Sequence, residues 1–242
     1  MAQEPFSSLP VRRIEEHRRN PLPRGEWPAT VPAVRQVLDE GLDLGPLTVL
    51  VGENGAGKST LVEGIAEAYG LSVEGGTRDQ VLHWTQATES GLHHHLQLVR
   101  GVGGARDGVF LRAETMHGTF AYLSEVNRPG GAYNFQSHGE SFLEFLVTRS
   151  RTRGLWIFDE AESALSFTAC MALVGQVRKL LAEGSQVVLS THSPLLAALP
   201  EADLYELGEW GLRPCAYDDL DMVRNWRLFL DAPQRFLRHL DS

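Results

Sequence analysis

Eight residues beginning at Gly52 place the strongest constraint on the fold of this chain. They read Gly-Glu-Asn-Gly-Ala-Gly-Lys-Ser and match the pattern G-x-x-x-x-G-K-[ST] at every fixed position. A short apolar run, residues 47–51, precedes them, and residues 59–69 have helical spacing that stops at Gly70. The order strand, glycine loop and helix favours a phosphate-binding loop over a glycine-rich turn that serves only the fold.

Each part of this motif has an expected role in holding a nucleoside triphosphate. The glycines let backbone N–H groups face the phosphates, the helix that begins near Lys58 offers its positive end, and Lys58 reaches the β- and γ-phosphates. We expect Ser59 to hold Mg²⁺ and Thr60 to lie beside the α-phosphate. The predicted nucleotide-binding residues are Gly52, Glu53, Asn54, Gly55, Ala56, Gly57, Lys58, Ser59 and Thr60.

Two acids, Asp159 and Glu160, directly follow an apolar run, residues 155–158, of the kind found in buried parallel strands. If this strand lies beside the strand of the phosphate loop, both acids reach the nucleotide at the carboxyl edge of the sheet. Asp159 is then expected to orient Mg²⁺, and Glu160 to polarise the attacking water, which favours hydrolysis over phosphoryl transfer to a small alcohol. The alternative is that the acids only begin the next helix. The phosphate loop upstream favours the functional interpretation.

Apolar runs alternate with helical patterns along the rest of the chain. The expected strands are residues 92–99, 109–112, 155–158 and 187–190, and the expected helices are 142–147 and 162–183. Prolines within the first 45 residues exclude long helices there, so strands and turns are expected. Residues 219–240 are expected to be helical, with Trp226, Phe229 and Phe236 in the core. This alternation predicts an α/β fold with a mostly parallel sheet.

Composition and charge restrict the function classes. The chain has 22 Lys and Arg against 31 Asp and Glu, a net charge of −9, which repels polyanions, so nucleic acid is possible as a partner but unfavoured. A local basic strip at Arg149, Arg151 and Arg153 is the one feature that keeps it open. The two cysteines lack the spacing of a zinc site or a disulfide framework. With no apolar run of membrane-spanning length and no signal peptide visible, we expect a cytoplasmic protein without direct membrane insertion.

These motifs together resemble the ABC-type ATPases, specifically the small AAA-family or SMC/RecF-like ATPases. The resemblance runs from the phosphate loop to His192. It implies that residues 161–166 form a D-loop, with Ser166 where an aspartate is frequent, and that His192 is the switch histidine that contacts the γ-phosphate. A lone histidine is more often structural, but its position after the run Val187-Val188-Leu189-Ser190-Thr191 favours the functional role.

A weaker match to the same family lies at residues 134–141. Ser137, Gly139 and Glu140 stand where the family's signature loop has matching residues, and His138 replaces its first glycine. The resemblance implies that this loop contacts ATP bound by a second protomer, which gives a head-to-tail homodimer. Ser137 and Glu140 also fit an ordinary capping box before an apolar helix start, and both interpretations can hold together.

Three further candidates are weaker. Glu114 falls where the family has a glutamine that senses magnesium, although an ordinary surface glutamate is an equal alternative. Trp27 either stacks on adenine or packs under the sheet, and packing is slightly favoured. In a strand, His93 and His95 would share one face and lack a third ligand, which disfavours a metal site.

The sequence therefore predicts a single domain, residues 1–242, of the P-loop NTPase type, with an ABC-like parallel sheet, flanking helices and a small β/helical subregion. Its expected parts are N-terminal strands and turns (1–45), the phosphate-loop unit (46–70), an inserted region with the signature-like loop (71–150), the Walker B to switch-histidine core (151–200) and the C-terminal elements (201–242). The expected catalytic residues are Glu160, His192 and Lys58, and the expected Mg²⁺ ligands are Ser59, Asp159 and Glu114. The alternatives to an ATP-hydrolysing homodimer are a transporter's ATP-binding subunit and an ATP-gated module paired with an effector protein.

Overall fold

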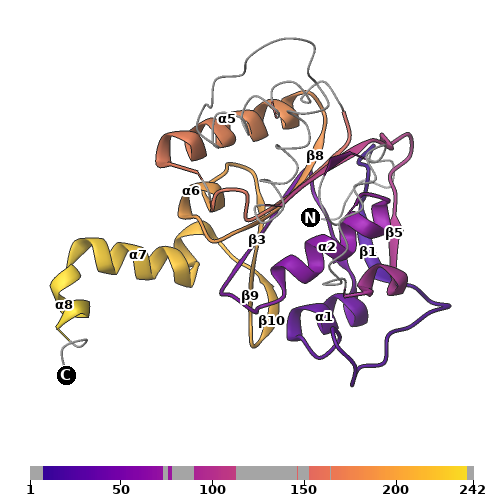
Figure 1. Cartoon of the computed structure of the whole chain (residues 1–242), viewed down its shortest axis with the longest axis horizontal. Coiled ribbons are helices and arrows are strands. Elements are labelled where there is room, and N and C mark those ends of the chain that lie inside the picture. Colours follow the sequence, from indigo (N-terminus) through magenta and orange to yellow (C-terminus); the bar gives the residue numbers. More distant parts are fainter. Residues whose placement is uncertain are drawn as a thin grey trace, which may run out of the picture.

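A seven-stranded sheet forms the centre of the molecule (Figure 1). The computed structural model describes residues 8–72, 76–77, 90–112, 146, 153–163 and 165–238. The strand order is β10-β9-β3-β8-β7-β6-β4. The strands are β3 (Leu47–Gly52), β4 (Gly76–Thr77), β6 (Gly108–Arg112), β7 (Leu155–Asp159), β8 (Gln186–Thr191), β9 (Asp203–Gly208) and β10 (Gly211–Pro214). Strands β9, β3, β8, β7 and β6 run parallel, and β4 and β10 pair antiparallel to their neighbours, so the predicted mostly parallel α/β sheet is confirmed.

The order of the three central strands corrects one expectation. The acid-bearing strand β7 was expected beside the phosphate-loop strand β3, but β8 lies between them. All three strands are parallel, so their carboxyl ends still meet at one edge of the sheet. This edge holds the phosphate loop after β3, the acids after β7 and His192 after β8.

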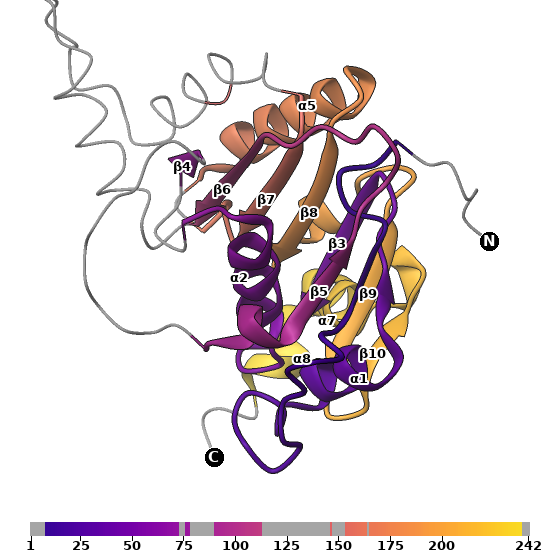
Figure 2. The ribbon, with the colours of Figure 1, turned by 90° about the vertical axis from the view of Figure 1, so that its right-hand side faces the viewer.

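Helices cover both faces of the sheet and bury a separate apolar cluster on each (Figure 2). One face packs against α1 (Pro32–Glu40) and α2 (Lys58–Tyr69), and the other against α5 (Phe167–Ala182) and α6 (Pro194–Ala197). The side chains of β7 alternate between the two clusters, with Leu155 and Ile157 in one and Trp156 and Phe158 in the other. This explains why β7 reads as an unbroken apolar run.

A small antiparallel sheet, with strand order β2-β1-β5, lies over α1 and α2. Its strands are β1 (Arg13–Glu16), β2 (Leu42–Asp43) and β5 (Leu96–Val99). Two expectations for this part need correction. The proline-rich start contains a nine-residue helix, α1, because Pro32 stands at its first turn, where proline is tolerated. The strand expected at 92–99 begins only at Leu96, and the 3₁₀ helix η1 (Leu92–His95) precedes it.

The boundaries of two helices show how local chemistry sets the site's framework. Helix α2 ends where Gly70 adopts a left-handed conformation and its N–H bonds to the carbonyls of Ala66 and Glu67, as expected. Helix α5 begins five residues later than the predicted Glu162, because Ser166 caps it by accepting a hydrogen bond from the N–H of Ala169. Residues 161–163 form a turn instead, so Asp159 and Glu160 do not begin a helix.

The C-terminal segment forms η2 (Tyr217–Asp219), α7 (Asp221–Asp231) and α8 (Pro233–Leu237), and the last two extend away from the sheet (Figure 1). The predicted helical character is confirmed, but the predicted core role is wrong. Trp226 is 49% exposed and Phe236 is 43% exposed. Phe229 contacts both rings edge-on, at centroid distances of 6.5 and 5.7 Å, so the three aromatic residues pack on one another. No described helix combines the length and apolar character that crossing a bilayer needs.

Candidate functional site

The phosphate loop connects β3 to α2 at the carboxyl edge of the sheet. Gly55 and Gly57 adopt φ angles of 82° and 98°, which a side chain would strain. The N–H of Ala56 bonds to the carbonyl of Glu53 at 3.2 Å and closes the loop. Gly57 is the N-cap of α2, and no side chain caps that helix. The amides at the start of α2 therefore keep the positive helix end available to an anion.

Gly57 is also confined by its neighbour on the N-terminal side of α1. A Cβ atom at this position would lie 2.7 Å from Cγ1 of Val31. We expect Gly57→Ala to lower the free energy of unfolding by about 1–2 kcal/mol, since an alanine at this φ angle is strained. Gly175→Ala is the matched control, because Gly175 lies on α5 with open space around it, and should raise stability by about 0.5–1 kcal/mol. Urea unfolding of both variants measures the two changes in the free energy of unfolding. Changes of the same sign and size would contradict the proposed strain at Gly57.

Lys58, Glu160 and His192 meet at one point above the loop, and we call them the Lys58–Glu160–His192 cluster. Nζ of Lys58 lies 2.9 Å from Nε2 of His192 and 3.5 Å from Oε1 of Glu160. Nε2 of His192 lies 2.6 Å from the same Oε1. The imidazole nitrogen therefore either donates to Glu160 or accepts from Lys58, depending on its tautomer. Three elements, α2, β7 and β8, bring these groups together.

The ammonium of Lys58 is buried and bonded to the loop itself. It donates to the carbonyls of Gly52 at 2.9 Å and Glu53 at 3.1 Å. Burial lowers the pKa of Lys58, and the charge of Glu160 opposes that shift. The lysine is therefore held over the loop by groups that a triphosphate would compete with.

Asp159 and Ser59 lie side by side below this cluster. Ser59 Oγ donates to Oδ1 of Asp159 at 3.1 Å, and the buried hydroxyl of Ser190 donates to the same oxygen. Burial raises the pKa of Asp159, while the hydrogen bond from Ser190 acts in the opposite direction. A hydroxyl and a carboxylate in contact are the oxygen ligands that Mg²⁺ prefers. Chemically, this pair therefore fits that ion.

Arg112, at the end of β6, completes the charge pattern around Asp159. It is the register partner of Asp159, and its Nε lies 3.5 Å from Oδ2 of that residue. Its Nη1 lies 2.6 Å from Oε1 of Glu63 on α2. No local sequence pattern marks this arginine, because a cation at a strand end opposite an acid can be recognised only once strand order and register are known.

Glu162 is a third acid near the site. Its Oε1 accepts hydrogen bonds from the hydroxyl of Thr191 and from the N–H of His192, the latter at 2.9 Å. Burial raises the pKa of Glu162, and the hydrogen bond from Thr191 opposes this shift. In the sequence Glu162 was only part of the D-loop-like segment. The available signal was its place three residues after Asp159, with a threonine at the end of a neighbouring strand.

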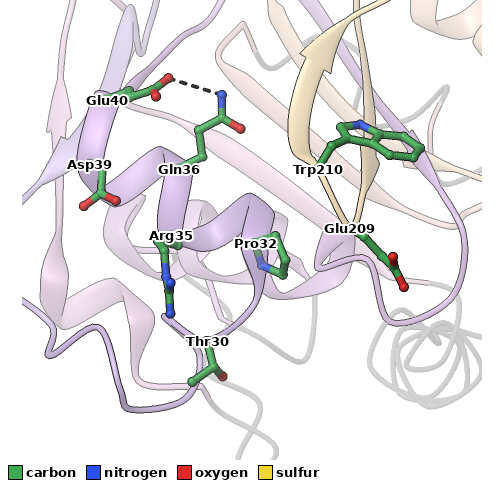
Figure 3. Close-up of a pocket in the computed structure, with 8 residues that line it drawn as sticks. All are labelled: Thr30, Pro32, Arg35, Gln36, Asp39, Glu40, Glu209 and Trp210. Carbon is green, nitrogen blue, oxygen red and sulfur yellow. Dashed lines mark hydrogen bonds between the residues drawn. The ribbon is translucent and has the colours of Figure 1, made fainter.

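A shallow hollow of about 490 Å³ lies between α1 and the β9–β10 turn (Figure 3). The side chain of Gln36 already has partners: it donates to Glu40, which also lines the hollow, at 3.2 Å and accepts from the N–H of Leu212 at 2.7 Å. The lining residues are Thr30, Pro32, Arg35, Gln36, Asp39, Glu40, Glu209 and Trp210.

The structure differs from the sequence-based expectations for Trp27 and for the histidines His93 and His95. The side chain of Trp27 is 57% exposed, so packing under the sheet is wrong. His93 and His95 lie on a 3₁₀ helix and not on a strand, and each ring bonds to its own partner, Glu67 and the carbonyl of Asn20. Within the described part of the chain, no group of three or more His, Cys, Asp or Glu side chains is arranged to hold a metal ion.

Several predicted residues lie outside the described residues. They are Glu114, Ser137, Gly139 and Glu140, together with Arg149 and Arg151 of the basic strip. Of the helix expected at 142–147, only Leu146 is described, and it is helical and buried. Ser166, at the D-loop position, caps α5. The described site therefore consists of the loop, the Lys58–Glu160–His192 cluster, and the oxygens of Ser59 and Asp159.

Comparison with known proteins gives relatives of one kind. The chain is 26% identical over 196 residues to a ribose import ATP-binding protein of Escherichia coli O157:H7, which covers 70% of this chain and 37% of the relative. It is 32% identical over 192 residues to an ABC transporter ATP-binding protein of Streptomyces coelicolor, covering 69% and 32%. The chain thus spans about a third of the length of these relatives. No protein-family model matches it.

A solved structure, the SMC head domain from Thermotoga maritima, is 13% identical with a TM-score of 0.44, covering 73% of this chain and 93% of that one. The mostly parallel sheet and the phosphate loop at its carboxyl edge define a fold of the P-loop NTPase type. The chain is thus similar in sequence to ABC-type ATP-binding proteins, which agrees with the resemblance that its motifs predicted.

Proposed function

We propose that this chain binds Mg-ATP at the phosphate loop, residues 52–59, and hydrolyses it as a head-to-tail homodimer in the cytoplasm. The observation that carries the proposal is the Lys58–Glu160–His192 cluster. A cation, a carboxylate and an imidazole converge within 3.5 Å at the mouth of the loop. Phosphoryl transfer to water needs charge neutralisation at the phosphates and a group that positions the water, and the cluster contains both.

Each residue then has a defined task. Lys58 exchanges its bonds to the loop carbonyls for phosphate oxygens, and the amides of residues 52–60, Thr60 included, surround the phosphates. Ser59 and Asp159 would hold Mg²⁺, which supplies charge neutralisation when bound. The carboxylate of Glu160 orients the attacking water and accepts its proton. His192 keeps contact with Glu160 and the terminal phosphate.

The dimer is proposed from the signature-like residues Ser137, Gly139 and Glu140, which complete the site of a second chain. This arrangement gives a complementation test. Lys58→Met and Ser137→Arg should each be inactive alone, because every site of either homodimer carries the defect. A mixture forms heterodimers with one intact site, made of Lys58 from one chain and Ser137 from the other, and should recover turnover.

Phosphate release by the two variants, alone and mixed, measures this effect. Recovery on mixing supports the sandwich, and light scattering should find a dimer in Mg-ATP. A mixture as inactive as its components would contradict the dimer but leave ATP binding at the loop in place. The control is Lys58→Met alone at twice the concentration, which matches the total protein in the mixture and should stay inactive.

A second candidate is the ATP-binding subunit of a transporter, which the names of the sequence relatives favour. That role predicts a surface that binds a membrane partner. A third, an ATP-gated module that acts through an effector protein, predicts binding without turnover. Glu114 is a further proposed contact to Mg²⁺. Nucleic acid stays unfavoured as a partner because of the net charge of −9.

A further inference from the structure

Glu162 lies on the turn after β7, but its carboxylate is bonded to the end of β8. Oε1 accepts from Thr191 Oγ1 and from the N–H of His192. Thr191 is fully buried, and its Oγ1 accepts in turn from the N–H of Ser193 at 2.9 Å. One carboxylate oxygen is therefore bonded directly to Thr191 and His192, and through the Thr191 hydroxyl it is linked to the N–H of Ser193.

This backbone path carries the imidazole of His192. The residue whose N–H is held by Glu162 places its ring 2.6 Å from Glu160. Glu160 is itself tied to β8, because its N–H donates to the carbonyl of Ser190 at 3.1 Å. Its φ angle of 49° is unusual for a side-chain-bearing residue, and surrounding bonds must hold such a conformation. Glu162 thus does not contact Glu160 through these bonds; it holds the backbone of His192, whose ring contacts Glu160.

The arrangement at Glu162 is costly for a residue that would serve only packing. Oε2 is buried and has no hydrogen-bond partner among the described residues. Burying a carboxylate with one oxygen unbonded is unfavourable in free energy, and the nearby charge of Glu160 increases this penalty. An apolar side chain would avoid this desolvation penalty but would accept no hydrogen bond from Thr191 or His192.

We propose that Glu162 is a positioning residue for ATP hydrolysis, which fixes residues 191–193 so that the ring of His192 stays against Glu160. The inference rests on the proposed function, because it assigns Glu162 a part in the same reaction. Glu162 acts through His192 and is not required to touch the nucleotide.

Three variants test this role. Glu162→Ala removes both hydrogen bonds and should lower kcat by about ten- to a hundredfold, the scale of a small misplacement at a reacting centre, with the Kd for Mg-ATP unchanged. Glu162→Gln keeps an oxygen that accepts both bonds and should recover most of the lost turnover. Thr191→Val removes one donor to Glu162 and the acceptor of the Ser193 N–H, but keeps the bond from His192 to Glu162, and should give an intermediate kcat. Glu183→Ala, an exposed site on the far end of α5, is the control.

A second readout does not depend on turnover. Hydrogen exchange at the N–H of His192 should be faster in Glu162→Ala than in wild type, and should stay slow in Glu162→Gln. Wild-type kcat in Glu162→Ala overturns the positioning role, as does a Kd that rises in step with the loss of turnover. If the alanine variant does not fold, a wild-type kcat in Thr191→Val overturns it instead. A wild-type protein without turnover contradicts the proposed function, while slow, Glu162-dependent exchange would still support the hydrogen bonds.

Discussion

Glu160→Gln should lower ATP turnover by about 10²–10⁴-fold while ATP still binds, because the amide keeps the shape of the carboxylate but cannot accept the proton of the attacking water. The structure supports this split between binding and turnover. Glu160 contacts Lys58 and His192, but the loop glycines and the start of α2 do not depend on it. The nucleotide that remains bound should be ATP and not ADP, and the variant should accumulate as a dimer in Mg-ATP.

The measurement is steady-state phosphate release, together with chromatography of the nucleotide extracted from the protein. Glu183→Gln is the matched control, since Glu183 is exposed and, within the described residues, its side chain forms an ion pair only with Lys179. Turnover close to wild type in Glu160→Gln would remove Glu160 from its proposed role. Loss of ATP binding in this variant would instead make Glu160 a binding residue.

Lys58→Met should abolish ATP binding at concentrations that saturate the wild type. The substitution removes the ammonium that is proposed to bind the β- and γ-phosphates, and one charge-assisted contact of about 1.5–3 kcal/mol corresponds to roughly ten- to a hundredfold in affinity. Two phosphates share this ammonium, so we expect the loss to reach the upper end or exceed it. Calorimetric titration with Mg-ATP measures the change. Lys179→Met tests the chain's other lysine, which is exposed on α5, and should bind as wild type does.

The same substitution should not lower stability without nucleotide. Burial lowers the pKa of Lys58, so the folded chain binds this proton less tightly than the unfolded chain does. The buried charge therefore destabilises the fold at neutral pH, and this cost shrinks as the pH rises toward the unfolded pKa of lysine. We expect the free energy of unfolding of Lys58→Met at pH 7 to equal or exceed that of wild type. A clear decrease would mean that Lys58 stabilises the fold more than its burial costs.

The sequence predicted the site's main residues because their signals are local. The phosphate loop is a contiguous motif, and Asp159, Glu160 and His192 each follow a buried strand whose apolar run marks its end. Parallel strands deliver their carboxyl ends to one edge, so these residues could be expected together. The structure brings them together at Lys58.

What the sequence could not predict depends on which strands are neighbours. The insertion of β8 between β3 and β7 puts Ser190 against Asp159 and Thr191 against Glu162, contacts that no local pattern contains. Arg112 meets Asp159 only through the β6–β7 register. The prediction that the aromatic residues of α7 and α8 lie in the core was wrong for another reason. Their helical pattern is amphipathic, but the pattern alone does not say which surface the helix meets.

The central claim is tested most directly by the rate of Mg²⁺-dependent phosphate release from ATP. This rate is measured for the wild-type chain and for Glu160→Gln, prepared and assayed in the same way. The account predicts steady turnover by wild type that stops when Mg²⁺ is chelated and is at least about a hundredfold slower in the variant. Equal phosphate release by the two proteins, or release that continues without Mg²⁺, would contradict hydrolysis at the Lys58–Glu160–His192 cluster.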